Sequence, residues 1–423
     1  MAVRCRLMAE RELDVVVFGA TSVTGRRVCA YLAERAEQSG ARWAAAARDA
    51  GKARSVLAEC GVSAPETIVA DVTDEASLAA MATRTHVVLN LVGPYTHYGR
   101  PVIEACVAGG AHYVDLTGEI PFVRRMIDRF DSRAAETGVK VVQVSGFEAL
   151  PADLAVQLAA EAVRERFGEA LEGADLEVEI SGLPWPPRLS DVLSGGTLQS
   201  MAAIAAGDDE FDFKDPACLI TDPAAAETVR RASPISVMPR RGIDGSVLAP
   251  MQPAAFINPA VIHRSTALRG DEPLRYREGV RIPGPPATLP LRMAAAGAIS
   301  GSQAAVAGVA AAPAGLRRRL SNGLASVFPS SGFGPAADRL EGWAWGMTVT
   351  GRASAGREVR VTVEGEGHPG YLATARMLGE AGLLLAEPGA TPERTGCLTP
   401  AAALGTEQIE RFDHARLHFA VSA

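Results

Sequence analysis

A glycine-bearing turn near the N-terminus has the residue types needed to hold a phosphate group. Residues 14–18 (DVVVF) are an apolar run, GATSVTG follows at 19–25, and the next residues have helical spacing. In a strand–turn–helix unit the first glycine permits the tight turn, and the last one lets the helix pack on the strand. Gly19 and Gly25 stand at these positions. Because a helix N-terminus attracts anions, the pattern predicts a dinucleotide site.

Ser22 stands at the middle position, where such turns usually carry another glycine. Serine adds one small Cβ, and its hydroxyl can bond a phosphate oxygen, so we expect it to be tolerated and to contact the pyrophosphate. The alternative is a tight turn that binds no ligand. The cofactor-binding residues predicted from this turn are Gly19, Thr21, Ser22, Val23, Thr24 and Gly25.

The residues after the second apolar run indicate which dinucleotide binds. Proteins that bind NAD place Asp or Glu there, where the carboxylate bonds the ribose 2′-hydroxyl. Here Arg48 comes first and Lys52 follows. A cation at this point can pair with a 2′-phosphate, which favours NADPH, although Asp49 keeps NAD as an alternative. Asp71, after the third apolar run, is expected to touch the adenine or else to cap the next turn.

Apolar runs that alternate with helical patterns over the first 150 residues predict the sheet that positions this turn. Strands are expected at 14–18, 42–47, 66–72, 86–93, 111–118 and 139–145, with helices at 26–38, 76–81, 101–110 and 121–137 among them. This repetition is typical of a Rossmann-type, doubly wound parallel α/β sheet. The carboxyl ends of such strands meet at one edge, where ligands bind.

Polar residues follow three of these strands at that edge, in GPYTHYG (93–99), DLTGE (115–119) and SGFEALPAD (145–153). Their joint placement predicts an active site, although each residue alone is more typical of a turn or cap. The chemical groups that converge there are Tyr95, His97, Tyr98, Asp115, Glu119, Glu148 and Asp153.

Within this set we predict three catalytic candidates and three more cofactor contacts. Tyr98 and Tyr95 are preferred as donors that protonate the substrate or polarise its carbonyl, because a phenol can donate without burial of a charge. Glu119 is the alternative donor. The added cofactor contacts are Asn90, Gly93 and Pro94.

The chain after residue 150 has a different pattern. A helix is expected at 152–168, half-solvated strands at 174–181 and 358–364, helices at 371–386 and from Thr399, and a strand at 417–421. We therefore predict an NADP-binding Rossmann domain at 1–150 and a mixed α+β substrate domain at 151–423. Packing of the C-terminal helix and strand back on the first domain is an option.

Composition excludes several functional classes. A formal net charge of −7 argues against general nucleic-acid binding. The six cysteines include no CxxC pair, so neither a disulfide framework nor a metal site is expected, and a cytoplasmic location fits. The apolar residues 293–316 are rich in Ala and Gly and contain Pro313, which favours a soluble helix over peripheral membrane contact. No Tyr-x-x-x-Lys pair occurs, which disfavours a short-chain dehydrogenase.

Four segments, GATSVTGR (19–26), NLVGPYTHYG (90–99), AHYVDLTGE (111–119) and SGFEALPADL (145–154), resemble the saccharopine dehydrogenase-like NADP-binding family. SGGT (194–197), GHPGYLATARMLGEAGL (367–383) and GCLTPAAALG (396–405) resemble its trans-acting enoyl reductase branch. The resemblance implies a Rossmann domain, a substrate domain and reduction by NADPH. For the branch it implies reduction of carbon–carbon double bonds in acyl chains carried by polyketide synthases. The sequence departs from the family at Ser22 and in SGFEALPAD, where GFDSxPSD is usual.

Three functions are therefore considered. The leading one is reduction of an α,β-unsaturated acyl or polyketide thioester, with the chain delivered on a carrier protein. The alternatives are a saccharopine-type C–N or carbonyl reductase, and an NADP-binding sensor or scaffold without turnover. An acidic carrier would need a local basic patch, for which Arg317–Arg319 is the first candidate and Arg240–Arg241 the second.

Overall fold

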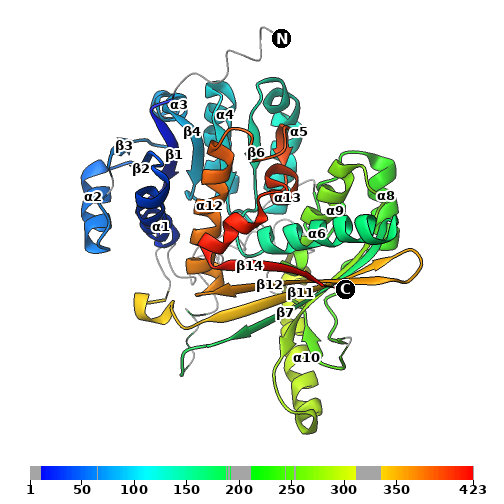
Figure 1. The fold of residues 1–423 in the computed structure, drawn as a ribbon. Coiled ribbons are helices and arrows are strands. Elements are labelled where there is room, and N and C mark those ends of the chain that lie inside the picture. The colour runs from blue at the N-terminus through cyan, green and yellow to red at the C-terminus, as the bar shows by residue number, and fades with distance from the viewer. Residues whose placement is uncertain are drawn as a thin grey trace.

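Two seven-stranded sheets organise the described part of the chain (Figure 1). The structure is a computed structural model. It describes residues 11–63, 65–186, 188, 191, 211–242, 244–251, 254–310 and 335–422.

The first sheet is wholly parallel, with strand order β13-β6-β5-β4-β1-β2-β3. Its strands are β1 (Leu13–Phe18), β2 (Trp43–Ala47), β3 (Thr67–Val69), β4 (Thr85–Asn90), β5 (His112–Asp115), β6 (Lys140–Val142) and β13 (Gly396–Leu398). The order runs outward from β1 in both directions, as in a doubly wound sheet. This confirms the predicted Rossmann-type fold.

Helices cover both faces of this sheet (Figure 1). One face packs against α1 (Val23–Ser39) and α12 (Thr374–Ala386), and the other against α3 (Glu75–Arg84), α4 (Tyr95–Gly109) and α5 (Ile120–Glu136). Helix α2 (Ala50–Glu59) follows β2. In β1, Val15 and Val17 face the first core, whereas Val16 and Phe18 face the second. The continuous apolar run is therefore explained by burial on both sides.

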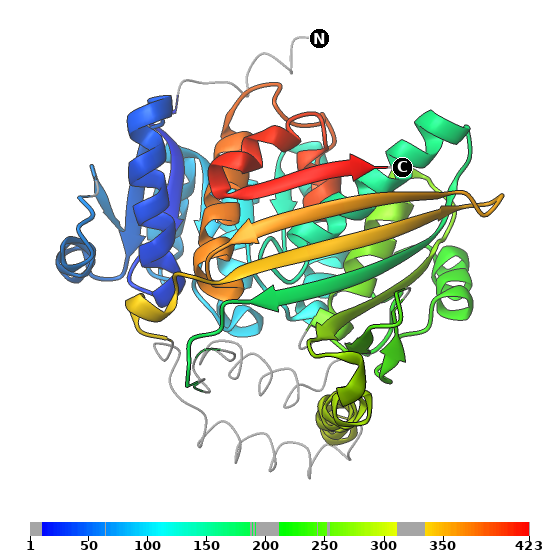
Figure 2. The same ribbon diagram turned by 60° about the horizontal axis from the view of Figure 1, so that its bottom comes forward.

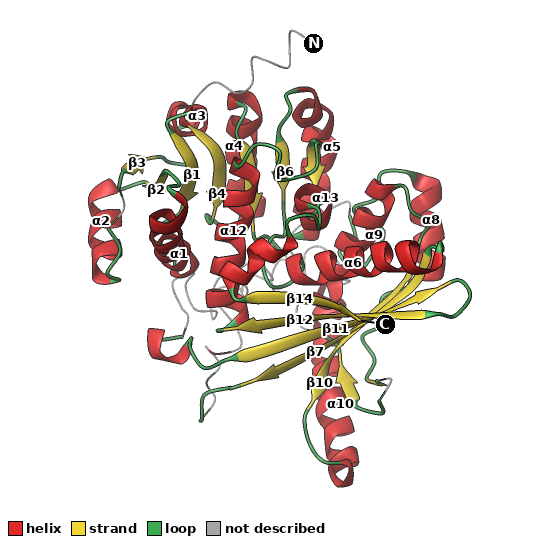
Figure 3. Cartoon of the chain, viewed as in Figure 1, coloured by secondary structure: helices red, strands yellow, loops and turns green. Residues whose placement is uncertain are grey.

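The second sheet is mixed and has the order β14-β12-β11-β7-β10-β9-β8. Its strands are β7 (Leu171–Ser181), β8 (Arg240–Arg241), β9 (Val247–Ala249), β10 (Arg275–Ile282), β11 (Ala344–Ala353), β12 (Glu358–Glu366) and β14 (Leu417–Ser422). β12 alternates buried valines with more exposed residues, as predicted from its sequence. Helix α6 (Leu150–Phe167) packs on β11 and β12, and α9 (Asn258–Arg269) packs on α6. Figure 2 shows this sheet with its long strands toward the viewer, and Figure 3 draws the strands of both sheets in yellow.

The remaining helices are short or lie at the margins. They are α8 (Pro223–Ala232), α10 (Leu289–Ala310), α13 (Pro400–Leu404), a π-helical turn (Pro369–Ala373) and 3-10 turns at Ala254–Phe256, Pro286–Thr288, Ala337–Arg339 and Ile409–Ala415. Within the described ranges, no helix is long and apolar enough to cross a membrane. Helix α10 includes the start of the predicted segment 293–316, whose last residues lie outside the described residues.

C-terminal residues complete the first sheet. β13 pairs in parallel with β6. On β6, buried Lys140 donates through Nζ to Thr391 Oγ1 at 2.6 Å, Pro392 O at 2.6 Å and Ala403 O at 3.1 Å. Burial lowers the pKa of this ammonium group to about 8. The predicted domain boundary at residue 150 stays a prediction, since the first sheet takes strands from both sides of it.

A buried charge cluster fixes α12 against α1. Glu380 of α12 is fully buried and accepts hydrogen bonds from Tyr31 Oη at 2.5 Å, Arg35 Nε at 3.1 Å and Arg411 Nε at 3.0 Å. Removal of one partner of such a buried pair leaves a charge uncompensated and typically costs about 3–5 kcal/mol. The cluster therefore holds the glycine-turn helix against the C-terminal part of the chain.

Helix α4 begins earlier than the sequence pattern predicts. We expected GPYTHYG to be a turn and the helix to start at residue 101, but Tyr95 is the first helical residue and Pro101 lies inside the helix. Proline is commonest in the first turn of a helix, and for this reason Pro101 suggested a later start. The true start is stabilised by Glu119, a residue from the next strand–helix connection. A cap so distant in sequence leaves no local signal.

Candidate active site

The turn after β1 has no room for side chains at its two glycines. Gly19 has φ +91°, and a Cβ there would lie 3.0 Å from the carbonyl carbon of Leu91. A Cβ at Gly25 would lie 2.3 Å from Gly19 O. Any larger residue would push the helix from the strand or the turn from the end of β4. The turn therefore has the close strand–helix approach that a dinucleotide requires.

Ser22 is the N-cap of α1. Its backbone is extended, with φ −69° and ψ 164°, and its Oγ accepts a hydrogen bond from Gly25 N at 2.9 Å. A serine cap of this kind typically stabilises a helix by about 1 kcal/mol. Val23 and Thr24 begin the helix, so their amides have no partner within it and can bind an anion. The serine thus supports the helix N-terminus that a pyrophosphate would meet.

The loop after β2 presents a cation. Arg48 is the first residue after the strand and is exposed, as is Lys52. The neighbouring Asp49 is the N-cap of α2 and accepts from Lys52 N at 2.9 Å. One oxygen of its carboxylate is therefore engaged in capping α2.

Asp71 closes its own turn. Its Oδ1 accepts from Thr73 N at 2.9 Å and from Thr73 Oγ1 at 2.8 Å. These hydrogen bonds lower the pKa of Asp71, and the charge of Arg48 adds a smaller effect. The turn-capping interpretation of Asp71 is thus the one with contacts behind it, while contact with adenine stays a prediction. The effect on its pKa also indicates that Arg48 lies near the end of β3.

Asn90, at the end of β4, is fully buried and holds the loop that follows. Its Nδ2 donates to Tyr113 Oη at 3.0 Å, and its Oδ1 accepts from Val92 N at 3.1 Å. Its backbone oxygen accepts from Tyr95 Oη at 3.0 Å. All of these groups are engaged within the protein, so Asn90 positions the segment around Gly93 rather than presenting its side chain to a cofactor.

Asp115, at the end of β5, ties this strand to β6. Its carboxylate accepts from Tyr113 Oη at 2.8 Å, and from Thr117 N and Val144 N at 3.1 Å each. Burial raises the pKa of Asp115 to about 7, although these hydrogen bonds oppose the shift. Val144 has φ +61°, a conformation that is strained for a β-branched residue. The strain lies at the edge where the sequence predicts the site, as is common for functional segments.

Two of the three predicted donors are engaged in positioning α4. Glu119 accepts from Tyr95 N at 3.0 Å, from Thr96 N at 2.7 Å and from Thr96 Oγ1 at 2.5 Å. A carboxylate at the first helical amides also interacts favourably with the helix dipole. Tyr95 is buried, its hydroxyl donates to the backbone of Asn90, and burial is the main cause that raises its pKa well above the usual value.

Tyr98 lies in the first helical turns of α4, so its predicted place in a loop is wrong. Its side chain is 41% exposed, and Gly93 and His97 beside it are also exposed. Pro94 is the N-cap of this helix and makes no side-chain cap. In the part of the chain that the structure describes, no protein group hydrogen-bonds the Tyr98 hydroxyl. Of the three predicted donors, Tyr98 is the one whose polar group is open to a ligand.

Thr374 holds the loop after β6 through contacts that the sequence pattern does not predict. Its Oγ1 accepts from Phe147 N at 3.0 Å and donates to Pro369 O at 2.8 Å. The Phe147 ring also packs edge-on against Trp345, with centroids 4.8 Å apart. The loop after β6 is thus clamped between α12 and the second sheet. The two segments are 227 residues apart in sequence, so no local pattern could reveal the contact.

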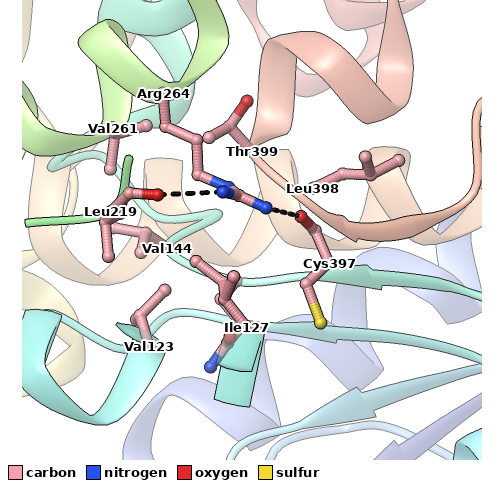
Figure 4. Close-up of a pocket in the computed structure, with 10 residues that line it drawn as sticks. Val123, Ile127, Val144, Leu219, Val261, Arg264, Cys397, Leu398 and Thr399 are labelled. Atoms are coloured by element: carbon pink, nitrogen blue, oxygen red, sulfur yellow. Dashed lines mark hydrogen bonds between the residues drawn. The ribbon is translucent and has the colours of Figure 1, made fainter. Parts of the chain in front are cut away.

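A small cavity lies between α9 and the first sheet, beside β13 and α5 (Figure 4). Buried Arg264 of α9 donates from Nη1 to Leu219 O at 2.8 Å and from Nη2 to Cys397 O at 2.7 Å. The cavity is lined by Val123, Ile127, Gln143, Val144, Leu219, Val261, Arg264, Cys397, Leu398 and Thr399. None of the predicted site residues is in this set, and Arg264 joins the connected segments through their carbonyls.

Metal-ligating residues do not gather in the described ranges, where no group of three or more His, Cys, Asp and Glu could hold an ion. His418, one of a C-terminal histidine pair, instead contacts Asp413 at 3.1 Å on the surface.

The fold and the glycine turn together define a protein with a Rossmann-type dinucleotide-binding domain. Residues 15–142 match the family model of the saccharopine dehydrogenase NADP binding domain. The chain is 33% identical over 423 residues to the trans-acting enoyl reductase of Mycobacterium ulcerans, covering 95% of this chain and 96% of the relative. It is 33% identical over 431 residues to that of Mycobacterium leprae, covering 96% and 97%. The protein belongs to the trans-acting enoyl reductase family.

A solved structure with a similar fold is the apo saccharopine dehydrogenase (L-Glu forming) of Saccharomyces cerevisiae. It is 15% identical, with a TM-score of 0.51 over 97% of this chain and all of that one. The homospermidine synthase of Legionella pneumophila, in complex with NAD, is 10% identical with a TM-score of 0.50 over 97% of this chain and 92% of that one. These likenesses support the fold alone.

Proposed function

We propose that this enoyl reductase acts with NADPH on an α,β-unsaturated acyl or polyketide thioester delivered by a carrier protein. The observation that carries the proposal is the likeness to trans-acting enoyl reductases along both sheets, from the glycine turn to the C-terminal strand. The name trans-acting enoyl reductase belongs to the relatives, and we infer the substrate class of this chain from it.

The residues around the glycine turn support NADPH as the cofactor. The amides of Val23 and Thr24, with the Ser22 hydroxyl, would hold the pyrophosphate at the start of α1. Arg48, with Lys52 near it, would pair with the 2′-phosphate. When bound, NADPH supplies the hydride that adds to the β-carbon of the substrate.

The start of α4 would position the substrate carbonyl. Glu119 and Asn90 fix the first turn of this helix through Tyr95. Tyr98 is on the exposed side of that turn, and its hydroxyl would donate a hydrogen bond to the thioester oxygen. A donor aimed at this oxygen stabilises the negative charge that develops there as the β-carbon takes up hydride.

For docking of the carrier protein, the basic residues predicted from the sequence remain the candidates. Arg240 pairs with buried Asp175, which neutralises half of the weaker patch. Arg317–Arg319 lie outside the described residues. The cytoplasmic location also stays a prediction.

Turnover with chemically distinct substrates tests the proposal. Purified protein should oxidise NADPH in the presence of a crotonyl thioester and yield the saturated thioester. Dependence on an amino acid co-substrate would favour saccharopine-type chemistry instead. Tight NADPH binding without oxidation, on free and carrier-bound enoyl chains alike, would favour a sensor or scaffold.

A further inference from the structure

The loop after β6 carries an acidic side chain that none of the roles above uses. The carboxyl of Glu148 folds back over Gly146, because a Cβ built at Gly146 would lie 2.4 Å from Glu148 Oε2. The same Cβ would lie 3.5 Å from Leu116 Cβ and 3.5 Å from Thr374 Cγ2. Leu116 directly follows β5, and Thr374 begins α12. The Glu148 carboxyl therefore lies at the carboxyl edge of the first sheet, beside the ends of β5 and β6.

This carboxyl also lies near the start of α4. Burial is the main reason why the pKa of Tyr95 is raised, and three carboxyl groups close to it add to the shift, those of Asp115, Glu119 and Glu148. Tyr98, the proposed carbonyl donor, is three residues further along the same helix. Tyr98 thus follows β4 and Glu148 follows β6, the two strands on either side of β5 at the carboxyl edge of the first sheet.

The other acidic groups at this edge are bound to protein amides. Asp115 and Glu119 each accept three hydrogen bonds, as described above, and Asp153 accepts from Ala401 N at 2.8 Å. Glu148 differs from them. Over the described residues it has neither an ion pair nor a hydrogen bond to another residue's side chain. Its carboxyl is available to a ligand.

The surroundings of Glu148 shift the titration of its carboxyl toward higher pH. Burial raises its pKa, opposed only by a hydrogen bond from its own backbone amide. Tyr95 on α4 is the titratable group close to it, and neither it nor the Asp115 and Glu119 carboxyls that also lie near Tyr95 is a cation. The residue is still partly exposed, so a substrate in the crevice can reach it.

The backbone that carries Glu148 is firmly held. Ala149 N and Leu150 N donate to Gly146 O at 3.2 and 3.0 Å, which closes a turn around Glu148. Thr374 holds the Phe147 amide from the other side. A fixed backbone aims the acid at one place, which general acid catalysis requires.

We propose that Glu148 is the acid that protonates the α-carbon of the enoyl thioester, an inference that rests on the proposed function. Addition of hydride to the β-carbon leaves the electron pair of the double bond at the α-carbon. That carbon takes the proton of Glu148, so an O–H bond breaks and a C–H bond forms. The carboxylate left behind takes up a proton from water before the next turnover.

Two substitutions and a control test this role in the full-length protein. Glu148→Gln should lower kcat with NADPH and a crotonyl thioester by about 10²-fold, the usual scale of acid catalysis. The decline of kcat at high pH should also disappear in this variant. Gly146→Ala should lower kcat as well, because its methyl group occupies the place of the carboxyl. Glu165→Gln, the same change at an exposed position of α6, should leave kcat unchanged.

Readouts without turnover separate this role from a structural one. NADPH affinity and the midpoint of thermal unfolding should stay at wild-type values in Glu148→Gln. Infrared difference spectra recorded against pH should show one titrating carboxyl fewer in this variant than in the wild type. Wild-type kcat and pH profile in Glu148→Gln would overturn the inference alone. Failure of the wild-type protein to reduce any enoyl thioester would overturn the proposed function and the inference with it.

Discussion

Replacement of Arg48 tests how the protein selects its cofactor. Its side chain is exposed at the end of β2, and the only carboxylate beside it in sequence, Asp49, caps α2. Arg48→Ala should therefore remove the single charge-assisted contact that we propose to the 2′-phosphate, which would be worth roughly 1.5–3 kcal/mol. At about 1.4 kcal/mol per decade, this is a loss of about one to two decades in NADPH affinity. Solvent screening at an exposed site favours the lower end of that range.

Titration calorimetry with both cofactors measures the effect. NADPH affinity should fall and NADH affinity should stay the same, because NADH has no 2′-phosphate. Arg48→Lys should keep part of the preference, since it retains the charge and loses the planar donor pair. Arg360→Ala, at an exposed position of β12, is a matched control for the loss of one positive charge. Equal losses for NADPH and NADH would refute the role of Arg48.

Three further predictions concern the glycine turn, the start of α4 and a buried histidine of β5. Ser22→Gly should leave NADPH affinity within a few-fold, whereas Ser22→Leu should abolish it by blocking backbone approach; normal binding by the leucine variant would move the phosphate site elsewhere. Tyr98→Phe should lower kcat by about 10²-fold with little change in NADPH affinity, because it removes one donor to a developing oxyanion. The variant should keep the pH dependence assigned to Glu148. An unchanged kcat, with chemistry rate-limiting, would exclude Tyr98 as the donor. Burial lowers the pKa of His112 to about 3, so the unfolded chain binds the extra proton and stability falls as the pH drops from 6.5 toward 3. In urea titrations, His112→Gln should reduce this slope by up to about 1.4 kcal/mol per pH unit, and an unchanged slope would contradict the assignment.

Much of the first sheet could be predicted because its patterns are local. β1 and β4 are continuous apolar runs buried on both faces, and Gly19 and Gly25 lie where the chain has no space for a Cβ. β13 could not be predicted as part of that sheet. It has three residues, and its partner β6 lies more than 250 residues earlier in the chain. Only tertiary packing defines so short a parallel strand.

The structure brings several of the predicted site residues to one edge of the first sheet, and their roles stay predictions. Phenols and carboxylates do gather at the carboxyl edge, as the strand order requires. Their division of labour depends on hydrogen bonds that no spacing encodes. Glu119 caps a helix that begins 24 residues earlier, whereas Glu148 has no such bond. The sequence shows two similar carboxylates, and only the structure distinguishes the one that is engaged from the one that is available.

The most direct test of the central claim follows the hydrogen atom that is transferred. The wild-type protein is incubated with a crotonyl thioester and NADPH that carries deuterium at the transferred position of C4, and the product is analysed by mass spectrometry and NMR. Enoyl reduction predicts a saturated thioester with one deuterium, located on the β-carbon. Deuterium on the former carbonyl carbon, or NADPH that stays unoxidised with every enoyl thioester offered, would contradict it.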